Sequence, residues 1–364
     1  MANRYSPRAL DYARARGPRR LVRMQSDHPT ARERELTERV SLTLPDGRLN
    51  REAVGFARWP LVDTAGIGHG SHGRGRNKRW EYWNVITPTH IAALTVSSID
   101  YAAVHEVWIF DRTTGEEVGE SATVLPPRGV TLPASLADGP TRARAKKLAI
   151  DLTPIADGGT RLRATIPDGV IDVVVSRPAA HDCLAVVVPW SDSRFQYTVK
   201  DVALPASGSL IIRGTEYTLP EGESWAVLDH GRGRWPYNIT WNWGAGSGRS
   251  GGHTIGLQVG GKWTTGTGVT ENGIVIDGRL HKIGAELRWD YSTTDFLAPW
   301  RLSGGGLSAE LVPFHDKRSR MQLGVLSGAT DQCFGTWSGS YDTGLEVIEF
   351  SGLTGFAEHV HNRW

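Results

Sequence analysis

The chain has 364 residues, of which 39% are hydrophobic and 22% charged, with 43 Gly, 19 Pro and 14 Trp. This length suits two domains or one large β architecture, and no apolar run approaches the roughly 20 residues of a membrane-spanning helix. Ten Arg and five acidic residues fall within residues 1–39, so the net charge of +2 hides a mildly acidic remainder. That remainder argues against a nucleic-acid-binding body, because phosphate contacts need a clustered basic face.

Residues 1–35 are predicted to form a basic disordered arm, because little apolar surface is available there to build a core. The arm lacks the apolar segment of a secretory leader, and Cys183 and Cys333 are too few for a disulfide scaffold. We therefore expect a cytoplasmic protein whose arm makes, at most, weak contact with an anionic surface. The sequence leaves the oligomeric state open.

After the arm, short apolar runs alternate with turn residues, as in antiparallel β proteins. Residues 104–110 and 117–125 flank a turn at residues 111–115, and Asp277 and Gly278 separate two later runs. Gly and Asp supply the positive φ or the local hydrogen bond that a tight hairpin requires. Strands at this spacing predict an all-β fold rather than alternating strands and helices.

The predicted strands extend over about 320 residues, which is more than one small barrel uses. Two antiparallel barrels or sandwiches packed together fit this length better. Pro, Gly, Ser and Glu cluster at residues 205–222, where a boundary is expected. We therefore predict an N-terminal β-barrel domain over residues 36–215 and a C-terminal β-barrel domain over residues 216–364.

The first unusual stretch is a glycine-rich basic loop at residues 66–79 that leads into Trp80 and Trp83. Its glycines match the dinucleotide fingerprint formally, but that motif acts at the start of a helix and no helical pattern follows. We expect no cofactor here. The loop is either an ordinary mobile connection or a lid over an anionic group of a ligand that Trp80 and Trp83 help to bind.

The second stretch, residues 225–243, alternates charged residues with glycines. In a strand, Asp229 lies on one face, while His230, Arg232 and Arg234 lie on the other. One interpretation is a structural ion pair that fixes the barrel. The other is an acid/base pair of His230 with a carboxylate in an aromatic-walled pocket. The further candidates for ligand contacts in that pocket are Trp235, Tyr237, Trp241 and Trp243.

Two further stretches supply candidates of weaker specificity. A Gly/Thr hairpin region at residues 260–273 contains Trp263, Glu271 and Asn272, and Glu271 is its only carboxylate. The C-terminal segment, residues 355–364, contains a carboxylate and a His-x-His pair, which lacks the third ligand of a zinc site. We therefore predict no metal, and we take Glu271 as a candidate acid with Trp263 and Asn272 as ligand contacts.

Several motifs together resemble one bacterial family, the domain of unknown function numbered 2804, over about residues 36–364. They are Trp80-Glu81-Tyr82-Trp83, Pro189-Trp190, Phe195-x-Tyr197-x-x-Lys200, Asp229-x-Gly231-x-Gly233-x-Trp235-Pro236-Tyr237, Trp241-Asn242-Trp243 and Gly355-Phe356-x-Glu358-x-x-x-Asn362-Arg363-Trp364. This resemblance by itself implies no activity.

A more distant similarity links the Asp229-His230-x-x-Gly233 element to two-domain lipocalin-like proteins, or calycins. That group includes carotenoid hydratases, tocopherol cyclases and fungal Diels–Alder cyclases. The resemblance implies two lipocalin-like barrels with a ligand cleft at or between them. Arg232 stands where the hydratases have a tryptophan, which suits a more polar ligand than a plain alkene. Fold similarity does not fix function.

Three functional hypotheses follow. The first is a lipocalin-like protein that binds a hydrophobic or amphipathic small molecule of the isoprenoid or lipid class. It would act as a binder only, or also catalyse acid/base hydration, cyclisation or isomerisation through Asp229, His230 and Glu271. The second is a carbohydrate-active or glycan-binding protein with Trp platforms and paired carboxylates. The third is a structural scaffold without catalysis.

Overall fold

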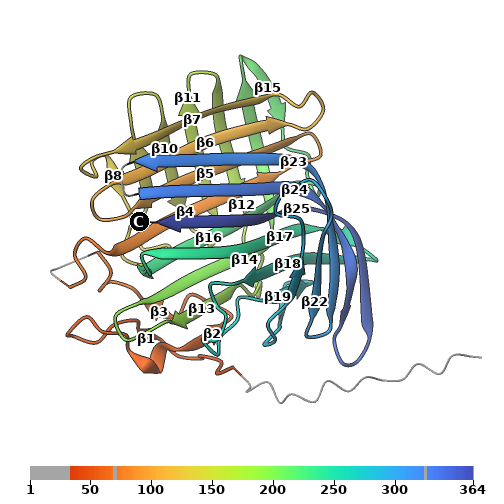
Figure 1. The fold of residues 1–364 in the computed structure, drawn as a ribbon. Helices are drawn as coiled ribbons and strands as arrows, with labels where there is room; N and C mark the ends of the chain where they lie inside the picture. The colour runs from red at the N-terminus through yellow and green to blue at the C-terminus, as the bar shows by residue number, and fades with distance from the viewer. Residues whose placement is uncertain (1–32, 69–71, 324–325, 364) are drawn as a thin grey trace, which may run out of the picture. The chain divides into compact units, whose positions relative to one another are not determined.

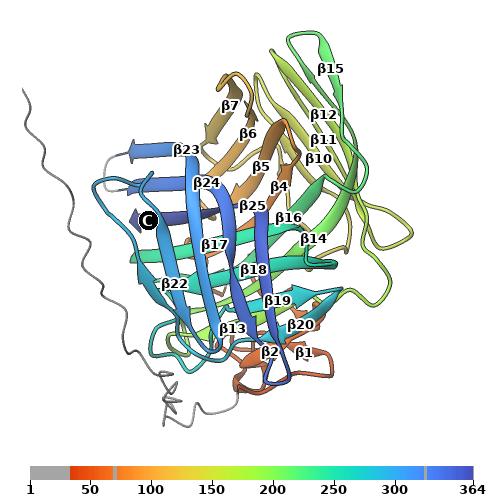
Figure 2. The ribbon, with the colours of Figure 1, turned by 90° about the vertical axis from the view of Figure 1, so that its right-hand side faces the viewer.

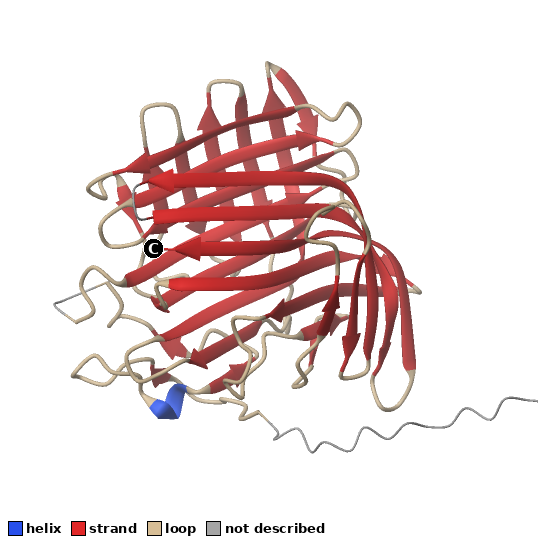
Figure 3. Cartoon of the chain, viewed as in Figure 1, coloured by secondary structure: helices blue, strands red, loops and turns tan. Residues whose placement is uncertain are grey.

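The computed structural model describes residues 33–68, 72–323 and 326–363. Strands dominate these residues (Figure 3), and the 3-10 helix η1 (Arg51–Ala53) is the only helix among them. No helix in the described part of the chain is long and apolar enough to cross a membrane. The prediction of an all-β fold built from two large antiparallel assemblies is confirmed, and each assembly is one curled sheet.

The first sheet is built around one long path of antiparallel strands. In spatial order these are β7 (Glu117–Val124), β6 (Ala103–Asp111), β5 (His90–Ser98), β4 (Asn77–Ile86), β16 (Trp225–Arg234), β14 (Phe195–Ile212), β12 (Gly169–Val175), β11 (Thr160–Ile166), β10 (Ala149–Pro154), β9 (Thr141–Arg144) and β8 (Val130–Thr131). Beside this path, β13 (Leu184–Pro189) and β15 (Thr215–Thr218) pair with β14, and β2 (Gly55–Ala57) pairs with β13. A separate parallel pair joins β1 (Val40–Ser41) to β3 (Val62–Asp63).

The second sheet has nine strands. Their order is β20 (Arg279–Lys282), β19 (Gly273–Ile276), β18 (His253–Gly261), β17 (Asn238–Ser250), β25 (Val347–Arg363), β24 (Leu326–Asp342), β23 (Leu307–Leu323), β22 (Trp300–Gly304) and β21 (Arg288–Asp290). The predicted turn between β19 and β20 has φ of 48° at Asp277 and 80° at Gly278. Positive φ at both central residues gives the two-residue hairpin turn that matches strand twist.

The chain passes from the first sheet to the second between β16 and β17 (Figure 2). β16 pairs with both β14 and β4 and therefore belongs to the first sheet. The change of sheet thus lies after Arg234, whereas the domain boundary was predicted between residues 215 and 216. A Pro at position 236 stands in the connection, where it cannot donate to either sheet.

One apolar cluster consists of side chains that pack within the first sheet, and another of side chains that pack within the second. A third cluster contains side chains from both sheets. This third cluster contains Ile86 and Trp108 from the first sheet and Trp243 and Phe356 from the second. The long strands β23, β24 and β25 accordingly lie beside the strands of the first sheet (Figure 1). The space between the sheets is therefore bounded by side chains from both.

The predicted arm, residues 1–35, lies outside the described residues except for its last three. Those three are attached to the folded protein by hydrogen bonds and ion pairs, although Arg34 and Glu35 are exposed. The side chain of Glu33 is 3% exposed and forms an ion pair with Lys282 at 2.8 Å. Glu35 pairs with Arg58, also at 2.8 Å.

Candidate functional site

Strand register brings polar side chains of the first sheet into one row that faces the second sheet. Lys200, Asp229, Tyr82, Thr95 and Glu106 are successive cross-strand partners on β14, β16, β4, β5 and β6. Directly paired residues share one face of a sheet. Five strands, from residues 77–111 and 195–234, therefore contribute to one polar surface.

The second sheet carries a matching row on β17, β25, β24 and β23. Its members are Trp243, Glu358, Gln332 and Lys317, again successive partners in the register. Trp241 lies two residues before Trp243 on β17 and therefore faces the same way. The two rows differ in character, because the second adds aromatic rings to its polar groups.

Direct contacts show that the two rows face each other. Lys317 Nζ lies 2.6 Å from Glu106 Oε2, and Gln332 Nε2 donates to the Tyr82 hydroxyl at 3.1 Å. Lys200 Nζ lies 3.8 Å from the ring centroid of Trp243. A cation on a tryptophan face is favourable by roughly 0.5–2 kcal/mol. These contacts hold the sheets together at one side of an inter-sheet pocket.

The inter-sheet pocket has a volume of about 330 Å³. Its wall contains five tryptophans, which are Trp80, Trp235, Trp241, Trp243 and Trp263. Trp235 stacks on Trp263 with ring centroids 5.6 Å apart and makes edge contacts with Trp80 and Trp241 at 5.4 and 5.3 Å. A mostly aromatic wall with a few convergent polar groups is typical of small-molecule sites.

Lys200 forms ion pairs with two carboxylates in this pocket. Its Nζ lies 2.9 Å from Asp229 Oδ2 and 3.6 Å from Glu271 Oε1. Thr198 donates to the other oxygen of Asp229 at 3.0 Å. Burial alone lowers the pKa of the Lys200 ammonium, but the attraction of Asp229 and Glu271 outweighs it and the pKa is raised. Lys200 therefore stays charged.

Two glutamates near this lysine are weak acids. Burial raises the pKa of Glu271 to about 7, against the attraction of Lys200. Burial also raises the pKa of Glu358 to about 7, although Trp241 Nε1 donates to its Oε1 at 2.9 Å. A carboxyl group with such a pKa is partly protonated at neutral pH and can act as a general acid.

The structure brings seven of the sequence-predicted residues together around the inter-sheet pocket. These residues are Trp80, Asp229, Trp235, Trp241, Trp243, Trp263 and Glu271. The remaining candidates lie elsewhere. Asn272 accepts from Gly260 N and donates to Ala285 O, which fixes local backbone, and Tyr237 is 49% exposed.

His230 does not share the pocket with Asp229. It is fully buried on the opposite face of β16, and neither ring nitrogen has a hydrogen-bond partner within the described residues. Burial and the charge of Arg232 lower its pKa well below the ordinary value, so the ring is neutral at pH 7. The structure therefore does not support an acid/base pair of His230 with Asp229.

Arg232 and Arg234 lie on the same face of β16 as His230. Their guanidinium groups donate to backbone carbonyls and do not line the inter-sheet pocket. Arg232 donates to the carbonyls of Trp80 and Pro133 at 2.9 and 3.0 Å. Arg234 donates to Asn77 Oδ1 at 2.9 Å and to the carbonyl of Gly47. Neither guanidinium lines the inter-sheet pocket, because strand alternation directs both away from it.

The glycines of β16 make room for side chains. A Cβ on Gly231 would lie 2.1 Å from Trp80 Cζ2, and one on Gly233 would lie 2.2 Å from Gln196 Oε1. These two glycines therefore allow the side chains of Trp80 and Gln196 to lie close to the strand. Trp83 faces the other way, where its Nε1 donates to Glu81 Oε1 at 2.9 Å.

Sequence reasoning did not place Lys200, Tyr82, Glu106, Gln332 or Lys317 in the site. Lys200 and Tyr82 do belong to the motifs that carry the family resemblance. Glu106, Gln332 and Lys317 have no local signal, because only pairing between distant strands brings them together.

The glycan hypothesis requires two carboxylates that flank a sugar bond. Asp229 and Glu271 approach each other, but the ammonium of Lys200 lies between them at 2.9 and 3.6 Å. The space that a scissile bond would need is thus taken by a buried ion pair. This geometry does not favour Asp229 and Glu271 as the carboxylate pair of a glycoside hydrolase.

A family model described as a domain of unknown function (DUF2804) matches residues 33–364, as the motifs predicted. No curated protein matches the chain in sequence. CghA solved with Sch210972 is similar in structure, with a TM-score of 0.51 and 10% identity over 79% of this chain and 89% of that chain. At this identity the similarity shows the fold alone.

Two further solved structures are similar at lower scores. A Nitrosomonas europaea protein assigned as a candidate AttH has a TM-score of 0.47 and 13% identity, over 80% of this chain and 94% of that chain. Kievitone hydratase from Nectria haematococca has a TM-score of 0.45 and 12% identity, over 81% of this chain and 90% of that chain.

Proposed function

This chain belongs to the family described as a domain of unknown function (DUF2804), and we propose that it binds an amphipathic small molecule in the inter-sheet pocket and transforms it by general acid catalysis. One observation carries the proposal. Two buried carboxyl groups with pKa values of about 7, Glu271 and Glu358, line a tryptophan-walled pocket of about 330 Å³. CghA, which has the same fold, was solved with a small molecule, and a small-molecule site here is compatible with that fold.

Glu358 is the better placed proton donor of the two. One of its oxygens accepts the hydrogen bond from Trp241, which leaves the other to carry the proton. Glu271 lies against the ammonium of Lys200, which favours its ionised form. A positioned general acid contributes about 10²–10⁴-fold in rate. We therefore assign the first proton transfer to Glu358.

The tryptophan wall suits a reaction that passes through positive charge. Protonation of an alkene or enol carbon leaves a carbocation, and an aromatic face stabilises a cation by roughly 0.5–2 kcal/mol. Trp241 and Trp243 flank Glu358 across the strand pair β17–β25. Capture of the cation by water gives hydration, and capture by another part of the substrate gives cyclisation. Loss of a proton from a neighbouring carbon gives isomerisation. Asp229, held by Lys200 and Thr198, is the carboxylate placed to accept a proton.

The test uses a variant that binds but cannot donate the proton. Protein and its Glu358→Gln variant are purified from the native host, and native mass spectrometry identifies the molecules that each retains. The variant is expected to accumulate an unsaturated substrate, whereas the wild type holds less of it or holds the product. Glu349→Gln, at an exposed position of the same strand, is the matched control.

Two outcomes would contradict the proposal. If neither protein retains a small molecule and neither binds one from a host extract, the pocket is not a ligand site. If wild type and Glu358→Gln retain the same molecule in the same amount and turn it over alike, Glu358 is not the acid.

A further inference from the structure

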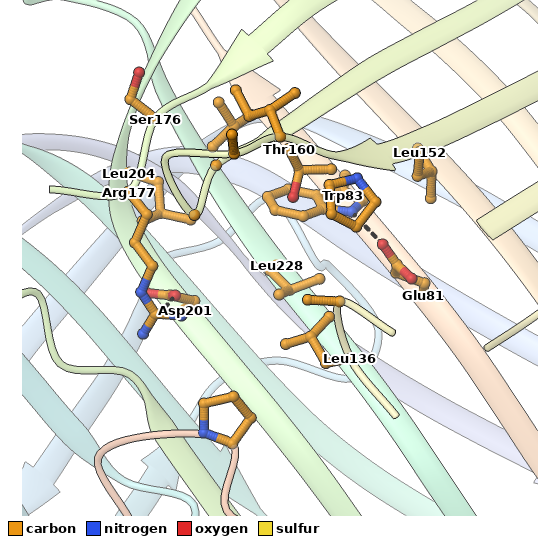
Figure 4. Close-up of a pocket in the computed structure, with 18 of the residues that line it drawn as sticks. Glu81, Trp83, Leu136, Leu152, Thr160, Ser176, Arg177, Asp201, Leu204 and Leu228 are labelled. Carbon is orange, nitrogen blue, oxygen red and sulfur yellow. Dashed lines mark hydrogen bonds and ion pairs between the residues drawn. The ribbon is translucent and has the colours of Figure 1, made fainter. Parts of the chain in front are cut away.

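A second cavity lies inside the first sheet, on the other side of β4 and β16 from the inter-sheet pocket (Figure 4). Its volume is about 250 Å³, and it shares no lining residue with the inter-sheet pocket. Alternation along the strands explains the separation. Tyr82 and Asp229 face the inter-sheet pocket, whereas Glu81, Trp83 and Leu228 line the second cavity.

The second cavity has an opening at its rim. Gly139 and Gly158 both line it, and a Cβ added at either would meet no atom within 4 Å. Ala137 and Ala156 are further small residues at the same rim. Ala137, Ala156 and Gly158 are themselves exposed, so the cavity meets solvent at these two turns.

One end of the cavity contains the carboxyl group of Glu81, but this group is already hydrogen-bonded within the protein. Glu81 Oε1 accepts from Trp83 Nε1 at 2.9 Å, and Glu81 Oε2 accepts from Thr141 Oγ1 at 2.6 Å. Both oxygens are thus satisfied within the protein. Leu136 and Leu228 lie between this end and the opposite one (Figure 4). This part of the cavity suits a hydrocarbon.

The opposite end holds a buried ion pair (Figure 4). Arg177 Nη2 lies 3.5 Å from Asp201 Oδ2, and His181 Nε2 lies 3.0 Å from Asp201 Oδ1. The side chains of Arg177 and Asp201 both line the cavity, and the side chain of Arg177 is 16% exposed. The pair has little net charge, so it favours a neutral group that can accept from Arg177 and donate to Asp201.

We propose that this cavity is a second ligand site, which binds an uncharged, mostly apolar molecule through a terminal hydroxyl group at Arg177 and Asp201. Its volume equals that of roughly eight water molecules at ~30 Å³ each. A chain of about that number of non-hydrogen atoms fills it. The site is independent of the chemistry assigned to the inter-sheet pocket.

The first test measures binding of octan-1-ol by calorimetry. Leu136→Trp fills the second cavity and is expected to weaken binding by at least about tenfold, equivalent to ~1.4 kcal/mol. Thr330→Trp, the matched control, fills the inter-sheet pocket and leaves binding within about twofold. The opposite pattern, or no binding to the wild type, would overturn the proposal.

The second test changes the charge of the polar end. The wild type is expected to prefer octan-1-ol to octanoate, because Asp201 repels a carboxylate. Asp201→Asn leaves the charge of Arg177 without its partner, so the preference should shift toward octanoate by about tenfold. Circular dichroism establishes that the variant is folded. An unchanged preference in a folded variant would show that the ion pair does not contact the ligand.

Discussion

The two faces of the strand pair β4–β16 have opposite chemistry, although their residues alternate within the same short segments. On the inter-sheet side, Asp229, Glu271 and Glu358 all act on the single ammonium of Lys200. On the other side, the carboxyl group of Glu81 is satisfied by two hydrogen-bond donors. On the first face the acids therefore surround one ammonium, whereas on the second face the carboxyl group of Glu81 is held by neutral donors. The role of a residue here follows from its face and not from the motif that contains it.

The largest loss of stability is expected when the Lys200 ammonium is removed from the inter-sheet face. Lys200→Met leaves Asp229 buried without its partner, and breaking a buried pair costs about 3–5 kcal/mol. Urea denaturation of the variant and of Lys147→Met, an exposed control, measures the loss. A loss below about 1 kcal/mol would mean that the acids on this face do not depend on Lys200.

A smaller loss of stability is expected from a change at Gly231, which lies on the inter-sheet face. Gly231→Ala places a Cβ 2.1 Å from Trp80, so either that ring or β16 must move. Overpacking of this kind costs about 1–3 kcal/mol. Gly284→Ala, whose nearest neighbour is 3.6 Å away, is the control. Equal unfolding free energies for the two variants would show that Trp80 is free to rotate away.

The pH dependence of stability sharpens the contrast further. The pKa values of Glu271 and Glu358 are raised from 4.5 to about 7, so the folded protein binds more protons than the unfolded chain between these values. Their contribution is therefore largest at low pH and is lost as the pH rises toward 7. The slope is at most about 1.4 kcal/mol per pH unit for each group.

Chemical denaturation between pH 5 and 8 measures this slope. Glu358→Gln removes one of the two titrating groups and should flatten the decline, whereas the exposed control Glu349→Gln should not. If the free energy of unfolding changes over this range by the same amount in all three proteins, the pKa of Glu358 is not raised.

The all-β fold and the aromatic wall were predictable because both are local. Asp277 and Gly278 formed the expected hairpin turn, and strand alternation correctly placed Asp229 opposite His230 and Arg232. The polar partners were not predictable in the same way. Lys317 and Glu106 are more than two hundred positions apart and meet only through pairing of the two sheets.

The hypothesis of an acid/base pair of His230 with a carboxylate illustrates the limit of a motif, because the neighbouring Asp229 was already expected on the opposite face. Adjacent residues in a strand point to opposite faces, so sequence proximity separates their side chains. Lys200 lies directly opposite Asp229 in the register and becomes its partner instead. The sheet change after Arg234 was also not foreseen, because glycines and tryptophans occur in β16 and continue into β17.

The central claim is that Glu358 carries a proton near neutral pH in the inter-sheet pocket. Carbon-13 NMR of the side-chain carboxyl groups, in protein labelled at glutamate, measures this directly. We predict two carboxyl signals with titration midpoints near 7, from Glu271 and Glu358. Glu358→Gln should lose one of them, whereas Glu349→Gln should keep both. A midpoint near the ordinary value of 4.5 for the signal lost in Glu358→Gln would contradict the account.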